Sequence, residues 1–339
     1  MTKAPVNVCI LATEDTSLST LFGLSDVLRS VGSAWEVFVS GTPGGSLFDV
    51  RIVAVEPEPL RCANGVVVTP DLSVADARET DVAIVASYVL PASEPPSESD
   101  ARALEWLTRQ HAAGAMIASA CTGAVVVAQT GLLDGWEATT HWAYRDMFRR
   151  HFPRVHMRLD QGLCVSGTEG RLVTSGGNTS WQELVLYLTA RYFSAEDASN
   201  TAKFWRLYNQ ERNQAAYMAV PKGMAHEDAV IRHCQDWIAR HYMAINPVGE
   251  MIARSGLSAT SFARRFRLAT GERPKDYVHQ LRVDRAKHLL ETTRAGVDGV
   301  GHTVGYEDPA SFRRIFKRTT SLTPSEYRRR FSHDRFATE

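Results

Sequence analysis

SFARRF at residues 261–266 and SFRRIF at residues 311–316 are two copies of one short pattern, and they decide the fold of the C-terminal part of the chain. Further identities at this offset of 50 residues include Pro274 with Pro324 and Tyr277 with Tyr327. Six identities at a single offset indicate an internal repeat, in which each copy is one structural unit.

Each copy has the layout of a helix-turn-helix unit. In the first copy, a helix over 247–255 precedes Gly256, which suits a tight turn because a residue without Cβ adopts a positive φ at no steric cost. Ser258 then suits the cap of a second helix over 259–270. Nothing in this part of the chain has the pattern of a strand, so we expect an all-helical domain.

The second copy repeats this layout with different residues. Gly305 forms the turn, Asp308 caps the following helix, and Pro309 is its first residue, where a missing N–H costs nothing. Pro274 and Pro324 are expected to end the second helix of each copy, because proline does not continue a helix.

The second helix of each copy has an apolar face and a basic face. Phe262 and Phe266 lie four residues apart on one side, as Phe312 and Phe316 do in the other copy. A helix fits the major groove of DNA, where Arg bonds both O6 and N7 of guanine and where Ala and Thr allow close approach. The predicted DNA-contacting residues are Thr260, Ala263, Arg264 and Arg267 in the first unit and Ala310, Arg313, Arg314 and Lys317 in the second.

A solvated, arginine-rich face of a helical bundle is the alternative interpretation, because many surface arginines contact nothing. The same face occurs twice in register with matching turns, which favours DNA binding. Charge agrees with this: 226–339 has 20 Lys and Arg against 14 Asp and Glu, whereas 1–225 has 18 against 24. Only the basic module is therefore expected to meet a polyanion.

The composition excludes several classes of protein. No run of roughly 18 or more uncharged apolar residues predicts a membrane span, and residues 1–8 lack the apolar core of a signal peptide. The five cysteines are scattered without a CxxC pair, which argues against a disulfide framework or a structural zinc site and fits a reducing cytoplasm. We expect a cytoplasmic protein with no membrane contact, no metal and no cofactor.

In the N-terminal part, short apolar runs alternate with helical patterns. The alternation predicts an α/β domain with a doubly wound, mainly parallel sheet that is covered by helices on both faces. The predicted strands are Asn7–Ala12, Trp35–Ser40, Asp81–Ala86, Ala115–Ala120, Gly162–Ser166 and Arg171–Thr174, and Gly65–Val68 is a further short apolar run. The predicted helices are Leu18–Val31, Asp100–Ala113, Ala124–Thr130 and Trp181–Phe193.

The pattern breaks at AVPKGMAH, residues 219–226, where Pro221 and Gly223 favour a linker. The predicted organisation is an α/β domain over 1–218, a linker over 219–226, and a helical domain over 227–332.

Cys121 stands at an abrupt junction between a predicted strand and a predicted helix. Such a junction presents a side chain at the carboxyl end of the sheet, where ligands bind in open α/β folds. A helix N-terminus there lowers the pKa of a thiol, and His141 in ATTHWAY is a candidate partner. These residues are compatible with a nucleophile, a pocket-lining residue or a buried structural cysteine.

The region 226–331 resembles the AraC-type DNA-binding domain, which has two helix-turn-helix units per chain; GYEDPASFRRIFKRTTSLTPSEYRRR is close to that family's signature. The family prefers Gly where Ser321 stands, and Gly271 keeps it in the first unit. The resemblance implies that 281–292 is a helix linking the two units. It also implies that the two recognition helices enter major-groove segments roughly one turn, ~34 Å, apart.

The region 6–193 resembles the PfpI-type, class I glutamine amidotransferase-like superfamily, whose sheet is flavodoxin-like. CTGAVVVAQTGLLDGWEATTHW, from Cys121 onward, is similar to the GlxA-like regulators, which join this domain to an AraC-type domain. Catalytic members have an acidic residue that contacts the cysteine, and the matching position in this chain is Thr20. They also have a Gly-Gly loop that forms the oxyanion hole, and this chain has Ser87-Tyr88-Val89 in its place. We therefore expect a sensor domain without catalysis. Its predicted effector pocket contains Cys121, Thr122, His141, Thr20 and Tyr88.

The resemblance implies a transcription activator that binds double-stranded promoter DNA, contacts RNA polymerase and forms a homodimer. Its small-molecule effector is expected to be an amino acid or a quaternary amine. One alternative is a cysteine-dependent hydrolase or amidotransferase-like enzyme with an accessory DNA-binding domain. Another is an architectural DNA-binding protein with a ligand-free N-terminal domain.

Overall fold

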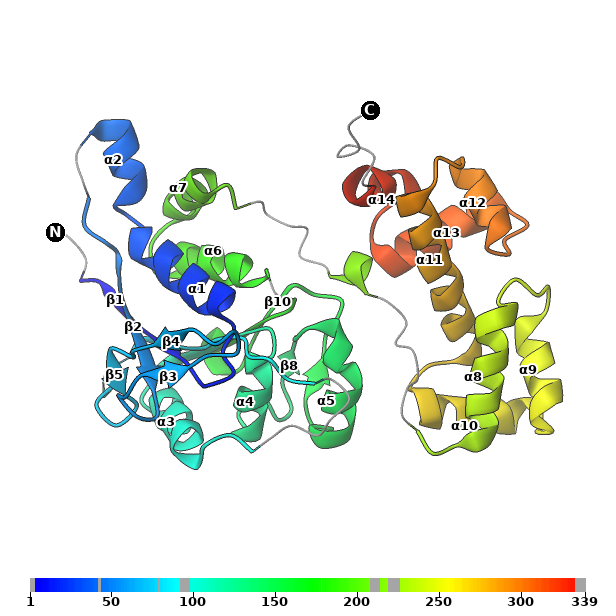
Figure 1. Ribbon diagram of the computed structural model, residues 1–339, viewed down its shortest axis with the longest axis horizontal. Coiled ribbons are helices and arrows are strands. Elements are labelled where there is room, and N and C mark those ends of the chain that lie inside the picture. The colour runs from blue at the N-terminus through cyan, green and yellow to red at the C-terminus, as the bar shows by residue number, and fades with distance from the viewer. Residues whose placement is uncertain are drawn as a thin grey trace. The chain divides into compact units, whose positions relative to one another are not determined.

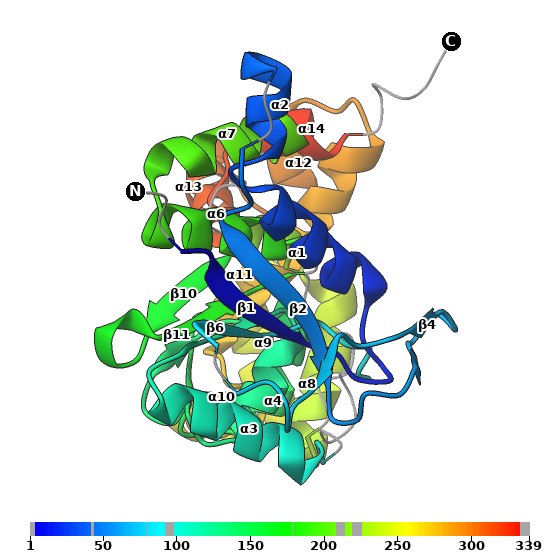
Figure 2. The same cartoon turned by 90° about the vertical axis from the view of Figure 1, so that its left-hand side faces the viewer.

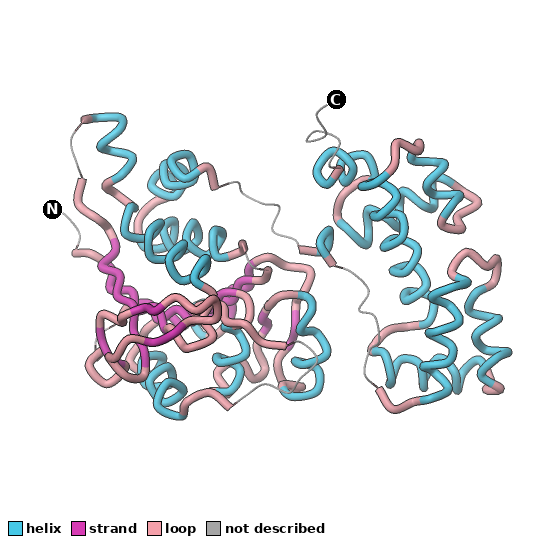
Figure 3. Tube along the Cα trace, viewed as in Figure 1, coloured by secondary structure: helices cyan, strands magenta, loops and turns pink. Residues whose placement is uncertain are grey.

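The computed structural model describes residues 4–41, 44–78, 80–91, 98–177, 179–207, 214–218 and 226–332. The chain divides into two compact units, Met1–Gln214 and Ala215–Glu339. Among the described residues, all strands belong to the first unit, as the magenta segments of Figure 3 show. The predicted domain borders stay a prediction, since the predicted linker lies outside the described residues except for His226.

A seven-stranded sheet forms the centre of the first unit (Figure 1). Every neighbouring pair of its strands is parallel except β10 with β11, which confirms the predicted mainly parallel sheet. In spatial order the strands are β10 (Leu163–Ser166), β11 (Leu172–Ser175), β7 (Met116–Ala120), β6 (Val82–Val85), β1 (Val6–Leu11), β2 (Phe48–Ala54) and β5 (Leu72–Ser73). Two small sheets accompany it, β3 (Leu60–Arg61) with β4 (Val67–Val68) and β8 (Glu137–Ala138) with β9 (His156–Met157).

Helices cover both faces of the sheet, as Figures 1 and 2 show. One face packs against α1 (Leu18–Ser30) and α6 (Trp181–Tyr192), and the other against α3 (Ala101–Ala112) and α4 (Gly123–Gln129). Alternate residues of β1 feed the two cores: Ile10 joins the first, and Leu11 joins the second. The remaining helices of this unit are α2 (Ala34–Ser40), α5 (Arg145–His151) and α7 (Ala195–Trp205).

The strand predicted at Trp35–Ser40 is wrong, because this segment is helix α2. The place beside β1 is taken instead by β2, whose Asp49 and Arg51 interrupt the apolar pattern and hid the strand. In α2 the apolar side chains are not in a core: Phe38 is 78% exposed and its ring lies 5.5 Å from that of Phe204 on α7. An apolar run alone does not distinguish a buried strand from an exposed helix.

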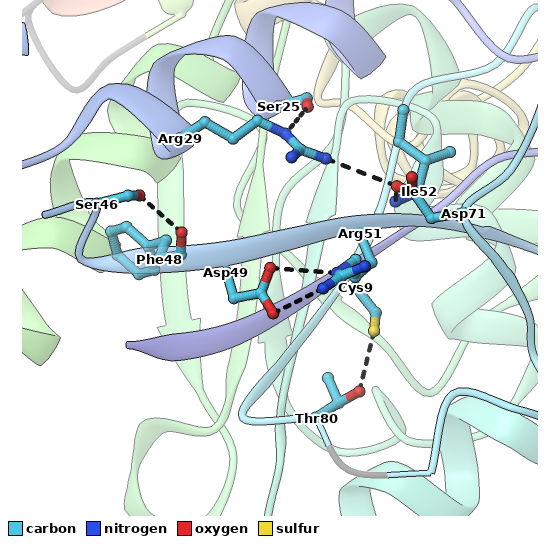
Figure 4. A network of polar contacts seen from close by, with 10 residues as sticks. All are labelled: Cys9, Ser25, Arg29, Ser46, Phe48, Asp49, Arg51, Ile52, Asp71 and Thr80. Carbon is cyan, nitrogen blue, oxygen red and sulfur yellow. Dashed lines mark hydrogen bonds and ion pairs between the residues drawn. The ribbon is translucent and has the colours of Figure 1, made fainter. Parts of the chain in front are cut away.

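Polar contacts hold the edge of the sheet near β2 (Figure 4). Asp71 accepts a hydrogen bond from the N–H of Ile52 at 2.7 Å and lies 3.6 Å from the guanidinium of Arg29 on α1. On β1, the Cys9 thiol accepts a hydrogen bond from the Thr80 hydroxyl at 3.1 Å. Burial raises the pKa of the Cys9 thiol, so this cysteine is a structural, protonated group.

The second unit is entirely helical over its described residues. Its elements are the 3₁₀ turn η3 (Ala215–Tyr217) and the helices α8 (Ala229–His241), α9 (Pro247–Ser255), α10 (Ala259–Thr270), α11 (Pro274–Thr292), α12 (Val297–Thr303), α13 (Pro309–Thr320) and α14 (Pro324–Phe331). None of the described helices of the chain is long and apolar enough to cross a membrane.

The helix α10 has the predicted bounds, 259–270, but neither α10 nor α13 reaches the proline that was expected to end it. The C-cap of α10 is Gly271 and that of α13 is Ser321, and both of these residues have a positive φ. Pro274 and Pro324 instead begin the next helices, because proline is well suited to the first turn. The linking helix therefore runs from Pro274 rather than from Leu281.

Candidate effector site and DNA-binding surface

Cys121 lies at a sharp elbow between β7 and α4. Its φ of 54° is in the left-handed region, which a non-glycine residue adopts only when its surroundings hold it there. Its N–H donates to the carbonyl of Ser175 at 2.9 Å. Gly123 allows the tight approach, because a Cβ there would lie 2.4 Å from the Val85 carbonyl oxygen. The predicted strand-to-helix junction is confirmed.

The loop that follows β6 is fastened to the elbow through Thr122. The Thr122 hydroxyl donates to the Tyr88 carbonyl at 2.6 Å and accepts from the Tyr88 N–H at 2.8 Å. It also lies 3.1 Å from the Ser87 hydroxyl. Since the Tyr88 N–H is already bonded, it does not serve as an oxyanion-hole donor in this arrangement.

The thiol of Cys121 is only 2% exposed, and burial raises its pKa. The Ser87 hydroxyl and the backbone N–H groups of Thr122 and His141 oppose this shift without reversing it. The thiol is therefore protonated near neutral pH, which disfavours nucleophilic attack.

His141 does not act as an imidazolium here. Burial lowers the pKa of His141, and its Nδ1 accepts a hydrogen bond from the N–H of Ala143 at 3.2 Å. Thr20 is buried in the first turn of α1, where its N–H donates to the Ser17 carbonyl. The five predicted pocket residues thus lie on β7–α4, the loop after β6, α1 and the segment after β8. Their role in binding an effector stays a prediction.

Three further residues of this site were missed by sequence reasoning. Thr140 donates from its hydroxyl to the Cys121 carbonyl at 2.7 Å, and the Tyr144 hydroxyl donates to the Leu90 carbonyl at 2.6 Å. Gln214 donates from Nε2 to the Thr140 carbonyl at 2.8 Å. Thr140 and Tyr144 flank His141 and were within reach of the motif, whereas no sequence signal connects Gln214 with Cys121.

The recognition helices are arranged as predicted. Ser258 caps α10 by accepting from the N–H of Ser261, and Asp308 caps α13 by accepting from the N–H groups of Ala310 and Ser311. The Phe pair of each helix is fully buried. The eight predicted DNA-contacting residues are all exposed: Thr260, Ala263, Arg264, Arg267, Ala310, Arg313, Arg314 and Lys317. That they contact DNA stays a prediction.

Two basic side chains near these faces are engaged in ion pairs. Arg313 pairs with Asp298 of α12. Arg265 forms a bidentate contact with Asp228, whose carboxyl pKa is lowered by the hydrogen bonds from Arg265. Arg264 and Arg314 occupy equivalent exposed positions in the two units, so they are the most direct candidates for base contacts.

Each helix-turn-helix unit has its own core. The first contains Met251, Phe262 and Phe266 with Tyr277 from the beginning of α11. The second contains Phe312 and Phe316 with residues from the later part of α11, among them Val283, Ala286 and Leu290. Figure 1 shows α11 running from the lobe of α8, α9 and α10 to the lobe of α12, α13 and α14.

The short turn η3 packs onto the second helix-turn-helix unit. Lys287 of α11 donates to the carbonyls of Ala215 and Met218 at 3.4 and 2.6 Å. The ring of Tyr217 packs edge-on against Phe331, and its hydroxyl accepts from Arg330 at 2.8 Å. Residues 215–218 are thus an integral part of the helical unit.

No group of three or more His, Cys, Asp or Glu that could hold a metal ion occurs in the described part of the chain.

Comparison with known proteins assigns both units. Residues 6–191 match the DJ-1/PfpI family, and residues 251–330 match a helix-turn-helix domain. The chain belongs to the DJ-1/PfpI family and continues into an AraC-type helix-turn-helix domain.

Similarity to transcription regulators extends along most of the chain. The chain is 25% identical over 285 residues to the HTH-type transcriptional regulator CdhR of Pseudomonas aeruginosa, covering 83% of this chain and 82% of the relative. It is 26% identical over 255 residues to the HTH-type transcriptional regulator GlxA of Rhizobium meliloti, covering 72% and 74%. A crystal structure of an AraC family transcriptional regulator from Pseudomonas putida is 16% identical with a TM-score of 0.48, covering 59% of this chain and 100% of the other. The similarity to the HTH-type transcriptional regulator CdhR spans 83% of the chain and so reaches into both units.

Proposed function

We propose that this protein is a sequence-specific transcription regulator whose helical unit binds promoter DNA and whose DJ-1/PfpI unit binds a small-molecule effector. The observation that supports it most is the pair of recognition helices. Both have buried phenylalanines on one side and exposed Arg, Lys, Ala and Thr on the other. Exposed Arg pairs in this arrangement suit base contacts in the major groove.

The effector is proposed to bind at the carboxyl edge of the sheet, beside Cys121. This edge is where ligands sit in open α/β folds, and the elbow places a helix N-terminus there. A role in sensing rather than catalysis is supported by the raised pKa of Cys121, the lowered pKa of His141 and the bonded N–H of Tyr88. An amino acid or a quaternary amine is the proposed effector class.

The route from effector to DNA is proposed to pass through residues 214–218. Gln214 is hydrogen-bonded within the first unit to Thr140, and Thr140 to Cys121. The following residues, Ala215 to Met218, are held within the second unit by Lys287. An effector that displaces Thr140 would break the hydrogen bond from Gln214 to the Thr140 carbonyl. The position of Gln214 would then be less restricted, and this change would be passed to residues 215–218, which follow it in the chain.

We further propose activation as the direction of regulation, a homodimer as the working form, contact with RNA polymerase, and a cytoplasmic location.

Footprinting of the full chain on selected DNA tests the DNA-binding proposal. The expected result is protection of two segments roughly one helical turn apart. Protection without any sequence preference would contradict it.

A cysteine-dependent enzyme is the second candidate, and the strained φ of Cys121 is the observation that favours it. Iodoacetamide labelling at neutral pH separates the two. A sensor with a protonated, buried thiol should label more slowly than a free cysteine. Fast labelling of Cys121, removed by Cys121→Ser, would support the enzyme.

A further inference from the structure

Arg282 lies at the boundary between the two cores of the helical unit. It is in the middle of α11, between Val278 of the first core and Val283 of the second, and it is 8% exposed. A buried guanidinium normally has a carboxylate partner. Among the described residues Arg282 has no ion pair, and burial lowers its pKa.

Backbone groups from both lobes surround this side chain instead. Nε of Arg282 donates to the Tyr242 carbonyl at 2.7 Å, and Nη2 donates to the Ala244 carbonyl at 2.9 Å. Both carbonyls belong to the connection between α8 and α9, in the first lobe. The guanidinium also lies 5.2 Å from the ring of Tyr306, which follows the turn of the second lobe.

The turn of the second unit packs directly against the same place. Gly305 has a φ of 92°, and a Cβ there would lie 2.9 Å from Cα of Met243 and 3.2 Å from the guanidinium of Arg282. His279, one turn earlier on α11, stacks on the ring of Tyr306 and lies 3.1 Å from its hydroxyl. The connection of one unit and the turn of the other therefore meet at Arg282.

We infer that Arg282 is a positioning residue that fixes the spacing and rotation of the two recognition helices, and so sets which separation of DNA subsites the protein accepts. Only a planar guanidinium reaches two carbonyls and an aromatic face at once. The helix α11 is the covalent connection between the lobes, and the contacts of Arg282 add a second connection that resists twisting about it. The inference rests on the proposed function, because it concerns how DNA is bound.

The test uses the full chain and a duplex selected for tight binding to it. Derivatives of this duplex carry one, two or five extra base pairs between the two protected segments. Each inserted pair rotates the second subsite by about a tenth of a turn and moves it by about 3.4 Å. The wild type should lose at least about tenfold in affinity when two pairs are inserted.

Arg282→Met should bind the original duplex more weakly and lose only about two- to threefold on insertion, because its lobes adjust to the longer site. Arg282→Lys, which keeps the charge but reaches one carbonyl at most, should fall between the two. Arg285→Met is the matched control, because Arg285 is exposed on the same helix and its guanidinium lies 5.7 Å from the ring of Tyr242. It should keep the full insertion penalty.

Arg282 variants that keep the wild-type insertion penalty would overturn the inference, even if their affinity or thermal stability falls. Arg282→Lys serves this purpose if Arg282→Met does not fold. If the wild type itself has no preferred sequence, the proposed function fails and the inference fails with it. If the wild type is specific but its variants show the wild-type penalty, only the role of Arg282 is wrong.

Discussion

In the first helix-turn-helix unit, α10 exposes Arg264 and Arg267 and, in its last turn, Leu268, which is 72% exposed. In the second, α13 exposes a longer basic series: Arg313, Arg314, Lys317 and Arg318. The C-cap of α10 is Gly271 and that of α13 is Ser321, both with a positive φ. Only the second core receives a residue from η3, Ala216. A repeated sequence therefore supports two units that differ in charge, in backbone strain and in what packs on them.

The largest expected effect concerns the independence of the two cores. Phe266→Ala and Phe316→Ala should each cost about 3–5 kcal/mol of unfolding free energy, because both side chains are fully buried. Hydrogen exchange should rise mainly in the lobe that contains the substitution, since the two residues belong to different cores. An equal rise in both lobes for either variant would show that the units unfold as one.

Arg314→Ala should cost about 1–3 kcal/mol in binding to the preferred site and much less on random DNA. Arg318→Ala is the matched control, because it removes a charge from an exposed position on the same helix that is not among the predicted DNA-contacting residues. Fluorescence anisotropy with both duplexes measures the difference. Equal losses of Arg314→Ala on specific and random DNA would assign this side chain to phosphate rather than to a base.

Lys287 should make the stability of the second unit depend on pH. Burial lowers its pKa from 10.5 to about 8, so the folded state disfavours the charged form. The free energy of unfolding of the wild type should therefore rise, relative to Lys287→Met, as pH increases from about 8 to about 10.5. Denaturant titrations of both proteins across this range provide the measurement. If the difference in unfolding free energy between the wild type and Lys287→Met stays constant with pH, the pKa of Lys287 is not lowered in the folded protein.

Ser321→Gly should stabilise the protein by about 1 kcal/mol, because serine is strained at a φ of 64°. The converse change in the other unit, Gly271→Ala, should destabilise it by a similar amount. Thermal unfolding of the two variants measures how much the residue at each helix end contributes to stability. The account of these helix ends is wrong if Ser321→Gly lowers the melting temperature.

The smallest expected effect is that of Cys121→Ser. The thiol is buried and protonated, so a hydroxyl should leave folding intact and change basal DNA affinity by less than about twofold. Gel-shift titration of both proteins without added effector checks this. A large loss of DNA binding would mean that the elbow supports the structure rather than an effector site.

Repetition and turn chemistry were enough to predict the helical unit. Gly256 and Gly305 form turns with a positive φ, and Asp308 caps α13. Turns and caps depend on residues that are close in sequence, so they can be inferred from the sequence alone. The strand-to-helix elbow at Cys121 was predictable for the same reason. The strand β2 was not, because Asp49 and Arg51 break its apolar pattern, and Trp35–Ser40 was misassigned because its apolar side chains are exposed.

Contacts between distant segments were beyond sequence reasoning. Gln214 reaches Thr140 across 74 residues, and Arg282 reaches Tyr242 across 40. Neither contact follows from periodicity, capping or a motif, because each depends on how separate elements pack. The first contact belongs to the proposed route from the effector site to residues 215–218, and the second is proposed to fix the two lobes of the helical unit relative to each other.

The central claim is that the helical unit reads DNA sequence through both recognition helices. The most direct measurement is the affinity of the full chain for a selected duplex and for a scrambled duplex, at several salt concentrations, with Arg264→Ala and Arg314→Ala. The account predicts at least about a thousandfold preference for the selected duplex, reduced by each variant. A preference near one, with both duplexes equally salt-dependent and both variants without effect on it, would contradict the claim.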